Sequence, residues 1–275
     1  GDVIRTKNVV WSINANITWI DNKVLSLPDS RKDYTLNGHE GFINGSTGFI
    51  GEGLPMGYIY MVDYAGVNPE TGESQWMQLK KEYAEDGETI LSEKWIKTSN
   101  YGDISSDPDS KVLLDSTLAD VFGGFGTTLY AYGFDLSIAF DYQLGGTTLD
   151  GSYAGYMAPS TASSLGKNYH LDLLDAWSQD NKDSNIPRFQ YADEYVAVTS
   201  TRFLTSTNYL NISNISLGYT FPAKWWKGHI QNLRVYVVCD NVWYWSARKG
   251  FDPRGTGTGQ YSPIRTLSGG VTLTF

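Results

Sequence analysis

The sequence has few of the groups on which many protein functions depend. It contains one cysteine, Cys239, which excludes an internal disulfide and a cysteine-based metal cluster. Its 275 residues include 21 Lys and Arg against 30 Asp and Glu. The net charge of −9 argues against a nucleic-acid partner, because phosphate binding requires basic patches. No apolar run approaches the roughly 18 residues of a membrane-spanning helix, so any membrane-spanning segment has to be a strand.

Signals for catalysis or metal binding are also missing. No GxSxG elbow or phosphate-binding loop occurs, and residues 180–183 (DNKD) lack the glycine and closing glutamate of a calcium loop. Asp135 and Asp141 are too far apart for a glycosidase pair, since six strand residues span roughly 20 Å. The three histidines are scattered, without metal-ligand spacing: His39, His170 and His229. The sequence therefore predicts no catalytic residue, no metal and no cofactor, and a protein that is not an enzyme.

What the chain does have is strict alternation of apolar and polar residues. In residues 134–144 the even positions are all large and apolar, whereas Asp135, Asp141 and Gln143 lie between them. Residues 9–19 and 267–275 repeat the pattern. Such a strand fits a membrane β-barrel wall, with lipid on one side and water on the other. It also fits a soluble antiparallel sheet with one wet face, and the pattern alone does not separate the two.

A barrel wall gives a specific expectation for each face. Apolar residues should point to lipid and their polar neighbours into a hydrated lumen. The predicted outward set is Trp11, Ile13, Ile17, Leu136, Ile138, Phe140, Val235, Val237, Leu273 and Phe275. The predicted inward set is Asn14, Asn16, Asp135, Asp141, Arg234 and Thr272. The 29 glycines, 19 tyrosines and nine tryptophans suit such a protein, with aromatic girdles and long loops.

Seven long strands are predicted, at residues 9–21, 58–67, 124–132, 134–144, 209–221, 233–245 and 267–275. Short turns are expected at one end, with the first strand running toward that end. Residues 68–123, 145–208 and 246–266 are expected to be long outer loops, while the long connection at 28–55 departs from this alternation. The apolar residues change from even to odd positions between Ile212 and Ile215, so a bulge is expected near Ser213 and Asn214.

Several strings resemble one family in order along the chain. They include GVNPETG at 66–72, GFDLSIAFDYQLGG at 133–146, WSQDNKDSNIPR at 177–188 and YLNISNISLGYTFP at 209–222. LRVYVVCDN at 233–241, GFDP at 250–253 and YSPIRTLSGGVTLTF at 261–275 complete the set. Together they resemble SusC-like TonB-dependent outer-membrane transporters of Bacteroidetes.

The resemblance implies an all-β fold, the antiparallel C-terminal part of a transmembrane β-barrel of about 22 strands with long extracellular loops. Residues 1–275 are then one domain, and the plug and earlier strands are expected to lie outside this chain. The implied function is active import of glycans or peptides across the outer membrane. The implied partners are a SusD-like surface lipoprotein, TonB (through the missing N-terminal part), the remainder of the barrel, outer-membrane lipid and an oligosaccharide or peptide ligand.

Aromatic residues in the predicted outer loops are the candidate ligand contacts, because their faces can stack on sugar rings. They are Trp76, Trp95, Trp177, Tyr153, Tyr156 and Tyr261. The alternative role for them is packing the loops against one another. Trp225 and Trp226 are expected instead at the periplasmic membrane interface, where amphipathic rings gather.

Two other functions fit parts of the pattern. A secreted or surface β-sandwich carbohydrate-binding module would use the same aromatic loops, but it needs two sheets whose apolar faces cover each other. A passive porin would share the barrel wall without the energised family's motifs. The sequence does not identify the substrate.

Overall fold

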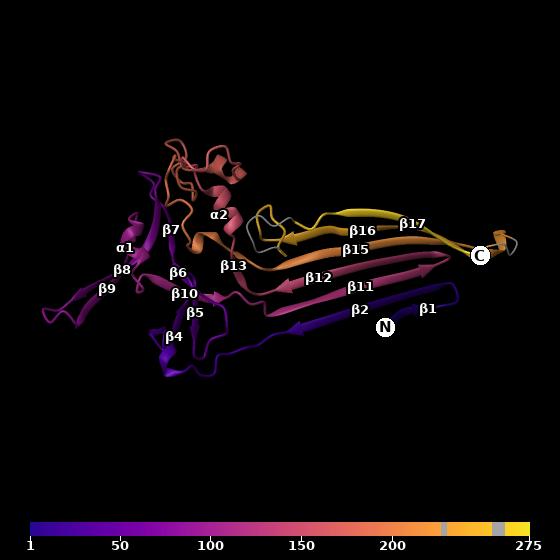
Figure 1. Cartoon of the computed structure of the whole chain (residues 1–275), viewed down its shortest axis with the longest axis horizontal. Helices are drawn as coiled ribbons and strands as arrows, with labels where there is room; N and C mark the ends of the chain where they lie inside the picture. Colours follow the sequence, from indigo (N-terminus) through magenta and orange to yellow (C-terminus); the bar gives the residue numbers. More distant parts are fainter. Residues whose placement is uncertain (227–229, 255–261) are drawn as a thin grey trace.

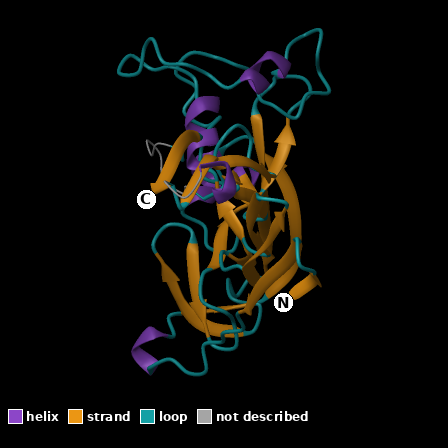
Figure 2. Cartoon of the chain, turned by 90° about the vertical axis from the view of Figure 1, so that its right-hand side faces the viewer, coloured by secondary structure: helices purple, strands orange, loops and turns teal. Residues whose placement is uncertain are grey.

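The computed structural model describes residues 1–226, 230–254 and 262–275, and strand is its main regular structure (Figure 2). The largest sheet in this described part is antiparallel, with seven strands in the order β1-β2-β11-β12-β15-β16-β17 (Figure 1). Their bounds are β1 (Asp2–Arg5), β2 (Val9–Trp19), β11 (Val121–Ala131), β12 (Phe134–Leu144), β15 (Tyr209–Phe221), β16 (Asn232–Ser246) and β17 (Thr266–Thr274). The antiparallel all-β class predicted from the sequence is confirmed.

The strand registers sort the side chains onto two distinct faces. Leu136 lies opposite Leu217, and Leu217 lies opposite Val237. Because side chains alternate along a strand, one face collects Trp11, Ile13, Ile17, Phe125, Leu136, Ile138, Phe140, Ile215, Leu217, Val235, Val237, Val271 and Leu273. The other face collects Asn14, Asn16, Asp135, Asp141, Asn214, Arg234, Asp240 and Thr272. The predicted division into an apolar and a polar face is confirmed, and Phe275 follows the end of β17.

The apolar face is not covered by a second sheet. Ile17 is 71% exposed, Val271 65% and Trp243 51%, values far above those of a sandwich core. The described structure is therefore not the β-sandwich of the alternative interpretation, whose apolar faces would be buried against each other. Within the described residues, no helix is both long enough and apolar enough to cross a membrane.

The polar face is held together by side-chain pairs between strands. Arg234 donates from Nε to Oδ1 of Asp135 at 3.0 Å and from Nη2 to Oδ2 at 2.5 Å. The pair passes directly over Gly218, where an added Cβ would lie 2.5 to 2.6 Å from these atoms. A side chain at residue 218 would therefore force the pair apart.

The prediction of a sheet strand at residues 58–67 is wrong. The structure divides it into β6 (Tyr58–Val62) and β7 (Tyr64–Val67), which belong to two smaller sheets, and β1 provides the seventh strand instead. Ile59, Tyr60, Met61 and Val62 are all buried. A run that is apolar at every position is typical of a strand covered on both faces, not of a wall with one wet face.

This correction also reverses the first long strand. β2 pairs with β11 and runs away from the end where residues 132–133 make a tight turn. The excursion that follows β2 therefore leaves from the same end as the other long connections, and the expected anomaly at 28–55 disappears. We call this end the loop end, and the opposite one the turn end. Tyr132 (φ 51°) and Gly133 (φ 92°) adopt the left-handed conformations that a two-residue hairpin requires.

Strand β15 carries the bulge predicted from the phase slip. Ala139 pairs with Asn214 but Phe140 pairs with Ile212, which leaves Ser213 without an opposing residue. β16 adds a second irregularity, since Asn214 pairs with Asp240 and Ile212 with Trp243. Asn241, which lies within it, has a φ of 51°. Asparagine tolerates this conformation better than most residues.

The long connections fold into a loop layer, which we define as the described residues of 20–120, 145–208 and 247–265. Figure 1 shows this layer gathered at the loop end of the large sheet. A five-stranded sheet comprises β3 (Tyr34–Leu36), β4 (His39–Asn44), β5 (Gly48–Gly51), β6 and β10 (Lys111–Ser116); β7, β8 (Ser74–Tyr83) and β9 (Ile90–Thr98) form a second, and β13 (Thr147–Leu149) and β14 (Leu204–Ser206) a third. The helices of the layer are α1 (Tyr101–Ser105), α2 (Gly151–Met157), η1 (Asp29–Arg31), η2 (Leu171–Asp175) and η3 (Thr201–Phe203).

Two small hydrophobic cores stabilise the loop layer. Phe49, Leu54 and Tyr60 form one of them. Val62, Trp76 and Ile104 form the other. Trp225 and Trp226 lie outside the layer, in η4 (Ala223–Trp226) at the turn end, and their place at a periplasmic membrane interface stays a prediction.

Arginine in place of Ile138 is expected to cost about 2–4 kcal/mol of stability in a bilayer, because Ile138 lies on the apolar face in the middle of β12. The matched control is Ser137→Arg, one residue away on the polar face, which should cost much less. Denaturant unfolding of the full-length protein in lipid vesicles measures both. Equal losses for the two variants would contradict the assignment of the faces.

Candidate functional site

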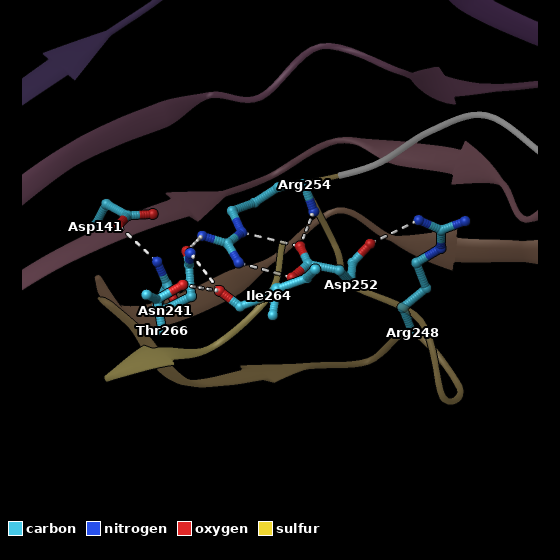
Figure 3. Close-up of polar contacts among 8 residues, drawn as sticks. Asp141, Asn241, Arg248, Asp252, Arg254, Ile264 and Thr266 are labelled. Atoms are coloured by element: carbon cyan, nitrogen blue, oxygen red, sulfur yellow. Dashed lines mark hydrogen bonds and ion pairs between the residues drawn. The ribbon is translucent and has the colours of Figure 1, made fainter. Parts of the chain in front are cut away.

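A polar network joins the large sheet to the loop layer at the loop end (Figure 3). On the polar face, Asn211 donates from Nδ2 to Oδ1 of Asp141 at 2.8 Å. Arg254 donates to Oδ1 of Asn241 at 3.0 Å and holds Asp252 through Nε and Nη2 at 2.9 and 2.7 Å. The bulge at Asn241 thus positions an acceptor for Arg254, and the connection after β16 is attached to the sheet.

Asp252 is suited to hold its charge in this network. Burial disfavours the charged carboxylate, but the hydrogen bonds and positive charge of Arg254 outweigh that effect and lower the pKa of Asp252 below its usual range. Arg254 in turn has a raised pKa because of Asp252. The pair therefore stays ionised at neutral pH.

Asp150 and Arg248 form a second, more buried connection. Arg248 donates from Nε to Oδ2 of Asp150 at 2.9 Å and from Nη2 to Oδ1 at 3.2 Å. The two side chains are 6% and 4% exposed. Asp150 also caps α2 by accepting from the backbone N–H of Tyr153 at 3.0 Å. One carboxylate therefore fixes both the start of α2 and the chain just after β16.

A third group lies beside α2. Lys249 donates to Asp172, which also accepts from the hydroxyl of Tyr153 at 2.7 Å. These hydrogen bonds lower the pKa of Asp172, and Asp172 raises the pKa of Lys249. The Tyr153 ring packs edge-on against His170 and Phe203. Tyr153 is thus held rigidly on one wall of a cavity.

That cavity has a volume of about 520 Å³, which is within the usual range for a small-molecule pocket. Residues from α2, η2, η3, β14 and the chain after β16 line it. The charged residues that line it are Asp150, Asp175, Arg202 and Lys249. The uncharged polar residues that line it are Asn181, Ser184, Asn185 and Thr205. The cavity lies where these separate segments meet, and much of its lining is polar.

Five of the six predicted ligand contacts lie in the described structure, which does not bring them together into one site. Tyr153 lines the cavity, and Tyr156 is 42% exposed and stacks on Phe251 at 5.7 Å. Trp95 is 42% exposed and lies on β9, in the β7-β8-β9 sheet and not on α2. Trp177 is half-buried against Gly72, and its indole N–H donates to the carbonyl of Pro69 at 3.1 Å. Tyr261 lies outside the described residues.

The prediction for Trp76 needs correction. Its side chain is 1% exposed, inside the core with Val62 and Ile104, and its ring meets Tyr101 at 5.1 Å. A sugar ring has no access to a face so completely covered. The packing alternative weighed for the aromatic residues is the one that applies here.

The charged residues of this network and cavity were not predicted from the sequence. Asp150 and Arg248 are 98 residues apart, and Asn241, which lies in a bulge, is 13 residues from Arg254. The one local sequence signal near these residues is the GFDP string at 250–253, which resembles a motif of the family. Its aspartate is the buried Asp252.

Comparisons with known proteins agree with this architecture, although no family model matches the chain. The chain is 24% identical over 288 residues to TonB-dependent receptor P3 of Formosa agariphila, covering 99% of this chain and 27% of the receptor. It is 22% identical over 278 residues to TonB-dependent receptor SusC of Bacteroides thetaiotaomicron, covering 99% and 25%. A solved structure of the RagAB peptide transporter matches with a TM-score of 0.77 and 24% identity, over 100% of this chain and 28% of that chain.

The fold is thus similar to that of a portion of the RagAB peptide transporter. The resemblance to SusC-like TonB-dependent receptors, predicted from the sequence, is confirmed over nearly the whole chain. The chain spans about a quarter of the length of the curated relatives it matches.

Proposed function

We propose that this chain is part of an outer-membrane transporter that actively imports glycans or peptides. The observation that carries the proposal is the seven-stranded sheet, with an exposed apolar face and a hydrogen-bonded polar face. Lipid would cover the first face and the second would line a hydrated lumen. The proposed role is transport and not catalysis.

The earlier strands of the barrel would pair with the edges of β1 and β17 that are free within the described residues, and the plug would fill the lumen. Unpaired strand edges expose backbone donors and acceptors, which favours pairing with further strands. Energy would come from TonB through the part of the protein that lies outside this chain.

The loop layer would face the outside and form the vestibule against which a SusD-like surface lipoprotein closes. Loops anchored on a rigid sheet are well suited to hold ligand contacts in place. Trp95 and Tyr156 present exposed rings, and Tyr153 lines the cavity. Enclosing a ligand between two bodies buries more of it than either surface does alone.

Uptake by cells carrying the full-length protein tests this proposal. Fluorescent oligosaccharide and peptide mixtures should enter wild-type cells, and deletion of either the transporter gene or TonB should abolish their entry. Surface abundance of the transporter should be unchanged in the TonB deletion. Uptake that persists without TonB would indicate a passive porin, and unchanged uptake without the transporter would exclude an import function for these cargoes.

A further inference from the structure

Arg202 is a cation with no carboxylate partner in the described structure. It lies in η3, where its guanidinium carbon lies over the rings of Tyr64 and Phe203, at 5.4 and 4.9 Å from their centroids. Nη1 donates to the carbonyl of Val196 at 2.6 Å. Nη2 is buried without a hydrogen-bond partner among the described residues.

The other cations beside the cavity are paired. Arg248 is held by Asp150 and Lys249 by Asp172. Two carboxylates near Arg202 do not neutralise it: Asp63 accepts from the hydroxyl of Thr201, and Asp175 is an exposed residue on the cavity wall. Neither forms an ion pair with Arg202 in the described part of the chain.

The burial of the Arg202 guanidinium without an ion-pair partner among the described residues is energetically unfavourable. A buried charge is normally neutralised by a partner or by a ligand, because removing it from water is costly. Burial lowers the pKa of Arg202, which is the direction expected for a guanidinium without an anionic neighbour. The two neighbouring rings make cation–π contacts with the guanidinium and help to cover it.

We propose that the cavity binds a carboxylate group of the imported ligand and that Arg202 is its anchor. A guanidinium donates charge-assisted hydrogen bonds to a carboxylate, and these are roughly twice as strong as hydrogen bonds between neutral groups. Asn181, Ser184 and Asn185 supply further polar contacts on the same cavity. This inference rests on the proposed import function and narrows its ligand to an acid, either a peptide carboxylate or a uronic acid in a glycan.

The test uses the full-length transporter with its lipoprotein and two matched probe pairs. One pair is a short peptide with a free C-terminal carboxylate and the same peptide amidated. The other is a hexuronic-acid oligosaccharide and its neutral hexose counterpart. Calorimetry should show at least one acid binding about 10-fold or more tightly than its neutral partner, the preference expected for a hydrogen bond to a charged group. The pair that shows the preference identifies the source of the carboxylate.

Arg202→Gln should remove this preference while weak binding of the neutral probe persists. Arg188→Gln is the matched control, because Arg188 also lies in the loop layer but binds Glu73 and does not line this cavity. It should keep the acid preference. A wild-type protein without acid preference, or one whose preference survives Arg202→Gln, would overturn the proposal.

A loss of surface abundance in Arg202→Gln without any change in the acid-to-neutral ratio would also overturn it, since Arg202 would then pair with another part of the protein. These results are independent of the broader function. Import of neutral cargo without acid preference leaves the transporter assignment intact and removes only the carboxylate site.

Discussion

Trp76→Ala should reduce the amount of correctly folded transporter at the cell surface. Trp76 fills the core of the β7-β8-β9 sheet with Val62 and Ile104, and its ring contacts Tyr101 and Tyr195. Truncating a fully buried tryptophan leaves a large cavity, which costs about 3–5 kcal/mol. Surface abundance and protease resistance of the loop layer measure the effect in cells carrying the full-length protein.

Trp95→Ala is the matched comparison, because Trp95 lies on β9 of the same sheet but is 42% exposed. It should leave abundance nearly unchanged and lower ligand capture. If Trp95→Ala lost abundance in proportion to uptake, its ring would be a packing element. If Trp76→Ala kept full abundance and lost only uptake, the sequence-based prediction that Trp76 contacts the ligand would be right.

Arg248→Met should detach α2 from the chain that follows β16. The substitution keeps the length of the side chain but leaves Asp150 buried without its cation, and breaking a buried ion pair costs about 3–5 kcal/mol. Amide hydrogen exchange in α2 and η2 should rise sharply, while exchange in β12 and β15 stays slow. The cavity is lined by residues on both sides of this pair, so ligand binding should weaken as well.

Lys182→Met is a control for charge removal alone, since the contact of Lys182 with Glu70 is exposed and spans 3.6 Å. Exposed pairs of this kind contribute about 1 kcal/mol or less. An Arg248 variant whose α2 exchange matches that of the Lys182 variant would show that the buried pair does not hold the loop layer together.

The large sheet was predictable because apolar and polar residues alternate along its strands, and alternate residues lie on opposite faces of a sheet. In β12 and β2 every second residue along the strand is apolar, so their two faces follow directly from a side-chain period of two. The bulge at Ser213 followed from the same rule, as a slip of phase. Residues 58–67 misled the prediction because a continuously apolar run specifies burial but not which sheet buries it.

The site was less predictable because it depends on contacts between distant segments. The Asp150–Arg248 and Asp172–Lys249 pairs each join residues more than 70 positions apart, and nothing in their local spacing distinguishes them from solvated charges. Aromatic residues were a poor guide for a related reason. Trp76 and Trp95 each follow a polar residue and precede an apolar one, and the fold buries one and exposes the other.

Accessibility in intact cells tests the central claim most directly, namely that the sheet spans the outer membrane with the loop layer outside. Single cysteines are introduced into the full-length transporter after its native cysteines, including Cys239, have been replaced. Ser163→Cys marks an exposed residue of the loop layer, and Lys7→Cys marks the turn end between β1 and β2. A membrane-impermeant maleimide should label residue 163 in intact cells and residue 7 only after the outer membrane is permeabilised. Equal labelling of both residues in intact cells, or labelling of residue 7 alone, would contradict the account.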